Sequence, residues 1–157
     1  MGVALTMKGK LEEAVAYYQK ALEMKRTTGD QHGEGSTLNN IGAVYWNLGQ
    51  YQESLDYYRQ ALEIRHKAGD KRGEGSTLNN IGKTYESQEQ YQEALDYYQQ
   101  ALTIRRAVGD KRGEGSTLNN IGEVYRNLSQ YQEAYDAFQS SININEMLGT
   151  IDILWMA

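Results

Sequence analysis

The chain of 157 residues carries 16 basic and 21 acidic side chains, giving a net charge of −5 at pH 7. This acidic balance argues against nucleic acid as the main partner. The sequence has no Cys, which excludes a disulfide framework, a thiolate metal site and a cysteine nucleophile. No stretch approaches the roughly 18 apolar residues of a membrane span and no signal peptide opens the chain, so we expect a cytoplasmic protein without membrane partners.

A repeat of 40 residues organises the sequence. The segment GEGSTLNNIG occurs at residues 33–42, 73–82 and 113–122, and the residues before it match the second half of the same unit. We therefore expect a single repeat array over residues 1–157. It divides into a truncated repeat, three full repeats and a final tail or start of a further helix, at residues 1–30, 31–70, 71–110, 111–150 and 151–157.

The apolar residues of each unit follow a helical period. In the first half of one unit, Leu38, Ile41 and Tyr45 fall three and four residues apart. In the second half, Leu55 and Tyr58 lie on one stripe, and a neighbouring stripe makes the apolar face wide. A helix with such a wide face packs on two neighbours, which is typical of a solenoid.

Glycines mark the expected turns. Leu48-Gly49-Gln50 is a short connection that favours an antiparallel hairpin. Gly69-Asp70 combines a glycine helix stop with an aspartate that can cap the next helix. We expect half a helix at residues 1–8 and then helices at about 11–28, 31–48, 51–68, 71–88, 91–108, 111–128 and 131–148.

On these residues the chain resembles a tetratricopeptide repeat array over nearly its whole length. That family alternates two antiparallel helices around small and aromatic residues at fixed offsets. The matching positions are Gly42, Gly82, Gly122, Tyr45, Tyr85, Tyr125, Tyr51, Tyr91 and Tyr131. The resemblance implies an all-α fold, a right-handed superhelical solenoid of antiparallel helix pairs.

The departures from the family pattern identify a long-repeat form. The usual period is about 34 residues, and the proline that usually ends the second helix is replaced by His66, Arg106 and Glu146. Without that stop the second helix can run further. This form is similar to the repeats of kinesin light chains, Pins-type spindle-orientation adaptors and bacterial signalling proteins. The resemblance implies a non-catalytic scaffold that binds a protein or an extended peptide segment.

A ligand of such a solenoid would lie on the concave surface formed by the first helices. Helical geometry places paired asparagines opposite the apolar stripe, at Asn39, Asn40, Asn79, Asn80, Asn119 and Asn120. A carboxamide offers a donor and an acceptor, as does each residue of an extended peptide. We favour the more inward Asn40, Asn80 and Asn120 as peptide ligands. Two alternatives are that these asparagines bond between adjacent helices, or that the copies are recent duplications still little changed.

Selectivity would come from the positions of this face that differ between repeats. They are Trp46, Lys83, Glu86, Glu123 and Arg126, with Ala43 in one slot. This mixture favours a peptide of mixed charge with an apolar anchor near Trp46, because a large aromatic residue on a solvent face is commonly a contact residue. The alternative is that these positions are solvated and free to drift.

The sequence offers no catalytic constellation. Gly73-Glu74-Gly75 lacks the Lys-Ser/Thr ending of a phosphate loop and follows a helix. The two histidines, His32 and His66, lie in different repeats, so we expect no metal site and no cofactor. Without a nucleophile, base and orienting group in one place, we expect no enzyme.

Both ends of the array are expected to expose apolar surface. Residues 1–8 cover only part of the following helix, and residues 151–156 are apolar where earlier repeats are polar. Solenoids usually need polar capping helices. The chain is then either a fragment of a longer array or a module that self-associates through its ends, as a dimer or in end-to-end stacks.

Overall fold

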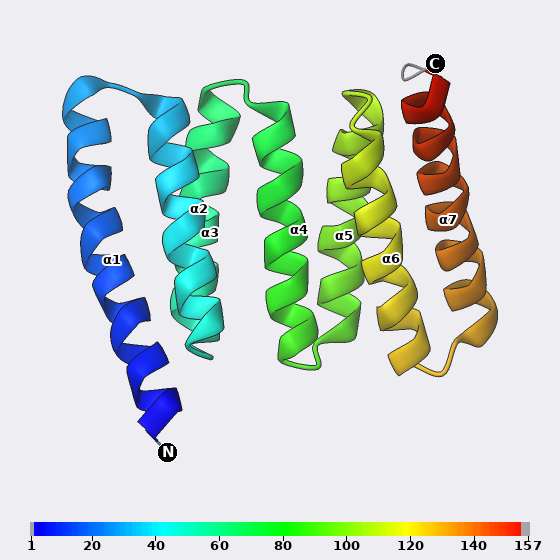
Figure 1. Cartoon of the computed structure of the whole chain (residues 1–157), viewed down its shortest axis with the longest axis horizontal. Helices are drawn as coiled ribbons and strands as arrows, with labels where there is room; N and C mark the ends of the chain where they lie inside the picture. Colours follow the sequence, from blue (N-terminus) through cyan, green and yellow to red (C-terminus); the bar gives the residue numbers. More distant parts are fainter. Residues whose placement is uncertain (1, 155–157) are drawn as a thin grey trace. The chain divides into compact units, whose positions relative to one another are not determined.

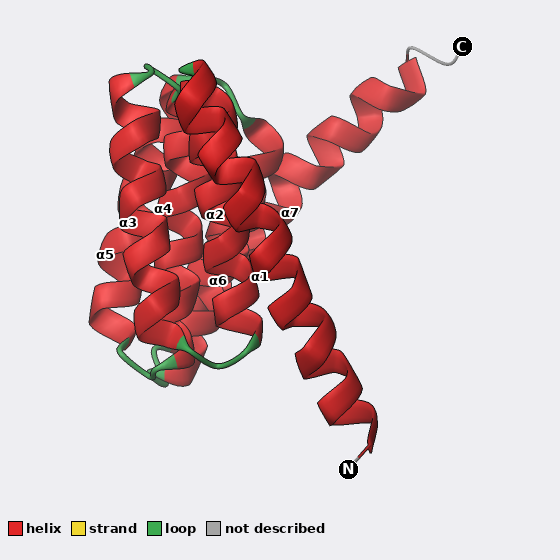
Figure 2. Cartoon of the chain, turned by 90° about the vertical axis from the view of Figure 1, so that its left-hand side faces the viewer, coloured by secondary structure: helices red, strands yellow, loops and turns green. Residues whose placement is uncertain are grey.

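The computed structural model describes residues 2–154, and the side chains of residues 9–149. Within this range the chain forms seven α-helices joined by short turns, and no strand (Figures 1 and 2). They are α1 (Gly2–Thr28), α2 (Gln31–Asn47), α3 (Tyr51–Lys67), α4 (Lys71–Ser87), α5 (Tyr91–Ala107), α6 (Lys111–Asn127) and α7 (Tyr131–Leu154). The predicted all-α fold of antiparallel helix pairs is confirmed, whereas the handedness of the array stays a prediction.

The helices form two compact units, unit 1 at residues 1–80 and unit 2 at residues 81–157. The boundary falls inside α4, so this helix contributes its first part to unit 1 and its last part to unit 2. The predicted repeat boundaries at residues 30, 70, 110 and 150 do not coincide with the boundary between these two units, and they stay a prediction.

The five internal helices begin at the predicted residues, but both terminal helices are longer than predicted. The expected break between residues 8 and 11 is wrong, because α1 is continuous from Gly2. Gly9 does not take the left-handed conformation that Gly49 adopts at φ +72° in the equivalent place. A glycine permits a left-handed turn without imposing one, and eight residues bury too little surface to hold a hairpin.

The expected end of the last helix near residue 148 is also wrong, because α7 continues to Leu154. Gly149 stays helical, and the residue after it is Thr150, where the other junctions have an aspartate cap. In the stretch at residues 11–24 that residues 1–8 were predicted to leave partly uncovered, Tyr17 and Met24 are 72% and 63% exposed, whereas Val15 and Leu22 are buried. The apolar side chains predicted to be exposed at residues 151–156 lie outside the described side chains.

The junctions between pairs follow the predicted chemistry. Gly69 lies at φ +69° and ends α3, and the Asp70 carboxylate then accepts a hydrogen bond of 2.9 Å from the Gly73 backbone N–H. The other two junctions repeat the contact at Asp30 and Asp110, with distances of 2.8 and 3.0 Å. A left-handed glycine followed by an aspartate cap satisfies backbone groups at both helix ends.

The small residue of each hairpin allows its two helices to approach closely. A Cβ atom on Gly42 would lie 2.7 Å from the Tyr58 ring, and one on Gly122 would lie 2.6 Å from the Phe138 ring. Real Cβ atoms essentially never come this close. The predicted role of these glycines is therefore confirmed.

Each unit has its own apolar core. Unit 1 buries Leu22, Leu38, Ile41 and Ala61. Unit 2 buries Ala94, Tyr98, Leu102, Leu118, Ile121, Val124 and Ala137. The apolar stripes read from the helical period therefore face the interiors of the units, which leaves the asparagine pairs and the variable positions to other helix faces.

Candidate functional site

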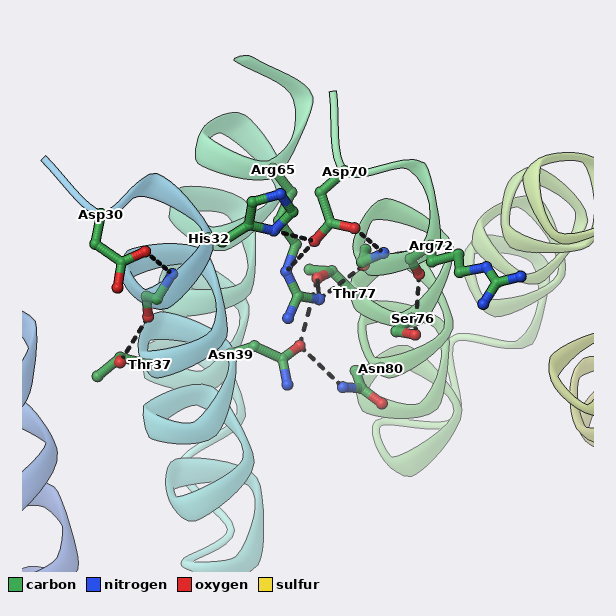
Figure 3. Close-up of polar contacts among 12 residues, drawn as sticks. Asp30, His32, Thr37, Asn39, Arg65, Asp70, Arg72, Ser76, Thr77 and Asn80 are labelled. Carbon is green, nitrogen blue, oxygen red and sulfur yellow. Dashed lines mark hydrogen bonds and ion pairs between the residues drawn. The ribbon is translucent and has the colours of Figure 1, made fainter. Parts of the chain in front are cut away.

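In unit 1, one predicted ligand residue is engaged within the protein. The Asn39 side-chain oxygen accepts hydrogen bonds from the Asn80 amide at 3.1 Å and from the Thr77 hydroxyl at 3.4 Å (Figure 3). These bonds join α2 to α4. This is the contact that the inter-helix alternative predicts, and it uses one donor of the favoured Asn80.

The other asparagines differ in exposure. Asn40 on α2 and Asn119 on α6 are exposed, and Asn120 is partly buried. Asn79 is 9% exposed, so it offers little surface to a ligand. In the part of the chain that the structure describes, Asn40, Asn119 and Asn120 are thus the asparagines of these pairs best placed to meet a partner.

A buried arginine links α3 to α4, and the sequence patterns did not single it out. The Arg65 Nη1 donates to the Gly73 carbonyl and to the Thr77 hydroxyl, both at 2.7 Å, and its Nε lies 3.8 Å from the Asp70 carboxylate (Figure 3). The residue is 7% exposed. Arg65 follows Ala61 by one helical turn, so its place on the buried stripe was the available signal.

Arg105 makes the same contacts in unit 2. Its Nη1 donates to the Gly113 carbonyl at 2.6 Å and to the Thr117 hydroxyl at 2.7 Å. Burial lowers the pKa of Arg105, and the nearby Asp110 carboxylate opposes that effect. Arginine starts from so high a pKa that it stays charged. Arg105 is therefore a buried cation that connects α5, in one helix pair, to α6, in the next.

The positions predicted to give selectivity lie in several environments. The Tyr98 hydroxyl donates a 2.6 Å hydrogen bond to the Glu86 carboxylate. Burial raises the pKa of Tyr98, and this carboxylate adds to the effect. Glu123 and Arg126 form an ion pair one turn apart on α6. Trp46 is partly buried and Lys83 is exposed.

A polar pocket of about 310 Å³ lies between α6 and α7 in unit 2. Its lining consists of Arg112, Gly115, Ser116, Asn119, Asn120, Ser141 and Asn145. Two predicted ligand residues, Asn119 and Asn120, are thus brought together with the amide of a third asparagine from α7. Amide donors and acceptors beside a guanidinium can bind the backbone and polar side chains of a peptide.

The pocket coincides with a change in the repeat. The position of Asn145 is held by Arg65 and Arg105 in the two preceding repeats. In unit 1, the stem of Arg65 packs so closely over Gly35 that a Cβ there would lie 2.9 Å from the arginine Cγ. In unit 2, the nearest atom over the corresponding Gly115 is the Asn145 side-chain oxygen, at 3.3 Å. The shorter side chain leaves space where an arginine stem would pack.

Other site types have no support in the described residues. Within residues 9–149, no three His, Asp or Glu side chains are grouped so that they could hold a metal ion. Of the helices in the described range, none combines the length and the apolar character needed to cross a membrane.

A tetratricopeptide repeat family model matches the chain in three overlapping windows, at residues 1–67, 33–107 and 73–147. The fold resembles BtubC (BKLC) from P. vanneervenii, at 23% identity and a TM-score of 0.80 over 90% of this chain. It also resembles aspartyl phosphate phosphatase F from Bacillus subtilis, at 22% identity and a TM-score of 0.80 over 91% of this chain. A Podosopora anserina protein, assigned as a kinesin light chain with nearly identical TPR-like repeats, matches at 18% identity and a TM-score of 0.67 over 89% of this chain.

The chain corresponds to part of each of these proteins. It spans 59% of the BtubC chain, 39% of the phosphatase chain and 69% of the Podosopora anserina chain. Among curated protein sequences, none matches this chain significantly. At these identities the structural likeness establishes the fold, and tetratricopeptide repeats are typically protein-binding and usually non-catalytic.

Proposed function

Because the chain belongs to the tetratricopeptide repeat family, we propose that it is a non-catalytic scaffold that binds a protein through an extended peptide segment. The observation that carries this proposal is the polar pocket of unit 2, in which Asn119 and Asn120 lie beside Arg112 and Asn145. Ligand pockets commonly measure about 300–1,000 Å³, so this pocket suits a short stretch of peptide. The cytoplasmic location predicted from the sequence stays part of the proposal.

The proposed mechanism is gripping of the peptide backbone by carboxamides. Each asparagine can donate to a peptide carbonyl and accept from a peptide N–H. In unit 2, Asn119 and Asn120 would supply these contacts, and Arg112 adds a positive charge that suits an acidic side chain or a backbone carbonyl. In unit 1, the exposed Asn40 is the corresponding candidate, because the amide of Asn80 already donates to Asn39.

Selectivity within this proposal falls to side chains that differ between repeats. Trp46 would provide an apolar anchor in unit 1. In unit 2, Lys83 and Glu86 of α4, with Glu123 and Arg126 of α6, present both charge signs. Charge complementarity at such positions changes specificity more than raw affinity.

The experiment is selection of binding peptides from a random display library against the full chain, followed by calorimetry with the best peptide. Replacing Asn119 and Asn120 together by Ala should weaken binding about tenfold or more, since each lost hydrogen bond contributes about 1 kcal/mol. Asn145→Arg, which installs the residue of the preceding repeats, should fill the pocket and block binding. Asn143→Ala, an exposed asparagine outside the pocket, is the matched control.

The proposal fails if the wild-type chain selects no peptide, or if the selected peptide binds the pocket variants as well as the control. Circular dichroism should show the same helical signal for all four proteins, which separates a binding defect from unfolding.

The runner-up function is self-association, and exposed apolar side chains favour it. On α1, Tyr17 is 72% and Met24 63% exposed, and α7 exposes Tyr131, Tyr135, Ile142 and Met147. Large contiguous patches of such side chains mark association sites, and these residues are the candidates for one. Light scattering across a concentration series tests this function. A constant mass near 17.8 kDa rules it out, whereas a dimer that Met147→Glu dissociates supports it.

A further inference from the structure

A pair of stacked tyrosine rings recurs in the chain. The Tyr45 ring of α2 stacks on Tyr57 of α3, with centroids 5.3 Å apart and planes inclined by 10°. Tyr85 and Tyr97 repeat the arrangement at 5.3 Å and 11°. The pairs lie in different units and have the same geometry, so a ring on the second helix covering a ring on the first is a regular feature of this repeat.

The third copy keeps the first ring and lacks the second. Tyr125 of α6 corresponds to Tyr45 and Tyr85, but the position of Tyr57 and Tyr97 is held by Ala137 of α7. Ala137 is 8% exposed and belongs to the core of unit 2. Its side chain ends at Cβ, so it cannot cover the Tyr125 ring as a tyrosine does in the other two copies.

A pocket of about 180 Å³ lies on Tyr125, between α5 and α6, and Ala137 belongs to the apolar cluster against which Tyr125 and Leu95 pack. Tyr125 and Ile121 of α6 and Leu95 of α5 form its apolar part. Three exposed polar residues of α5 complete the lining: Gln92, Asp96 and Gln99. An apolar cavity of about 150 Å³ holds a benzene ring, so the pocket has room for one aromatic side chain.

We propose that this pocket receives a tyrosine side chain from a partner protein, which stacks on Tyr125 as Tyr57 stacks on Tyr45. The chain itself provides the template for the occupant, because the two intact copies show which ring fits. Offset stacking of aromatic rings adds to the gain from the buried apolar area. The polar lining favours tyrosine over phenylalanine, since the Asp96 carboxylate and the two glutamine amides can accept a phenol proton.

The ring pocket is distinct from the polar pocket of the proposed function. The two linings share no residue, and the ring pocket uses α5 where the polar pocket uses α7. Ile121 and Tyr125 belong to the core-facing stripe of α6, whereas Asn119 and Asn120 do not. Either site can therefore fail its test without affecting the other.

The test uses N-acetyl-L-tyrosinamide as a probe and the full chain as the receptor. Titration followed by NMR should give saturable shifts of the Leu95 and Ile121 methyl groups and of the Tyr125 ring. Ala137→Tyr restores the residue of the other copies and should abolish the saturable shifts, because the ring of the chain itself then occupies the pocket. Ala107→Tyr, at an exposed alanine of α5 outside the pocket, is the matched control and should bind normally.

A second variant keeps the test decisive if Ala137→Tyr does not fold. Tyr125→Leu retains an apolar floor but removes the stacking ring, and it should weaken probe binding roughly threefold to tenfold. The proposal is overturned if the wild type shows no saturable shift or if N-acetyl-L-leucinamide produces equal shifts. It is also overturned if Ala137→Tyr folds and binds the probe as strongly as the wild type. If Ala137→Tyr does not fold, the proposal is overturned when Tyr125→Leu binds the probe as strongly as the wild type.

Discussion

The buried Arg105 makes a polar link between α5 and α6. Its guanidinium donates to the Gly113 carbonyl at 2.6 Å and the Thr117 hydroxyl at 2.7 Å, with the Asp110 carboxylate 3.9 Å from Nε. The residue is 7% exposed. Replacing it by Ala should therefore remove this polar connection between one helix pair and the following helix.

The size of the effect follows from the contacts. Each hydrogen bond to a charged group contributes about 1.5–3 kcal/mol to stability. Part of the lost stability is offset, because the variant no longer has to bury a cation away from water. After that offset, the loss of two such bonds gives an expected cost of about 2–4 kcal/mol for Arg105→Ala. The adjacent Arg106 is the matched control, because its side chain is 52% exposed and its partner Glu114 also bonds Lys111. Arg106→Ala should cost at most about 1 kcal/mol.

The assay is urea unfolding of both variants and of Arg105→Met, followed by circular dichroism. Met keeps an apolar stem but no charge, so its cost isolates the guanidinium from the packing of the stem. The reasoning is refuted if Arg105→Ala lowers the free energy of unfolding by less than about 1 kcal/mol, or if the two alanine variants cost the same. A methionine variant as stable as wild type would show that the stem alone holds the helices together.

Three further predictions concern turns, packing and pH. Glu89 and Ser129 both lie at φ 59°, so changing either to Gly should raise the free energy of unfolding by about 1 kcal/mol, and a lower melting temperature would contradict this. Gly82→Ala should lower the free energy of unfolding by about 1–3 kcal/mol, because a Cβ there would lie 2.7 Å from a tyrosine ring. Gly9→Ala should instead stabilise α1 by up to about 1 kcal/mol, because a Cβ there would have nothing within 4 Å. Equal melting temperatures for the two variants would contradict this difference. Burial raises the pKa of Tyr58 from 10.0 to about 12. Above pH 10 the Tyr58 hydroxyl therefore loses its proton more readily in the unfolded chain than in the folded one. The free energy of unfolding should fall by up to about 1.4 kcal/mol per pH unit until about pH 12. Urea unfolding from pH 9 to 12 should show a smaller fall for Tyr58→Phe, and an unchanged slope would contradict this assignment.

The regular part of the fold was predictable because local chemistry repeats there. Gly69 and Asp70 are adjacent in the sequence, and the structure confirms both predictions, the glycine as the helix stop and the aspartate as the cap of the next helix. The same reading failed at Gly9, where the glycine is present but the packing that stabilises a hairpin is not. A glycine's conformation depends on what the flanking helices bury, which a local pattern does not contain.

The candidate sites were less predictable, because they depend on contacts between helices. The sequence indicates that Asn39 and Asn80 lie on helix faces away from the core, but not that Asn80 donates to Asn39. The sequence likewise does not indicate the role of Arg65, because a basic residue in a polar chain is expected on the surface, whereas Arg65 is buried. Side-chain pairing across helices depends on the rotation and separation of both helices, which the apolar periodicity of each helix does not give.

The polar pocket and the ring pocket both lie where the sequence departs from its own repeat. At residue 137 an alanine replaces the ring that covers Tyr45 and Tyr85 in the other copies, and a pocket lies on Tyr125. At residue 145 an asparagine replaces the arginine, and the polar pocket lies over Gly115. Interiors are close-packed, so a large residue conserved between copies of one repeat indicates filled space, and its loss in one copy leaves a vacancy. In a chain of near-identical repeats, the shared residues account for the fold, and the positions that differ are the ones able to distinguish one ligand from another.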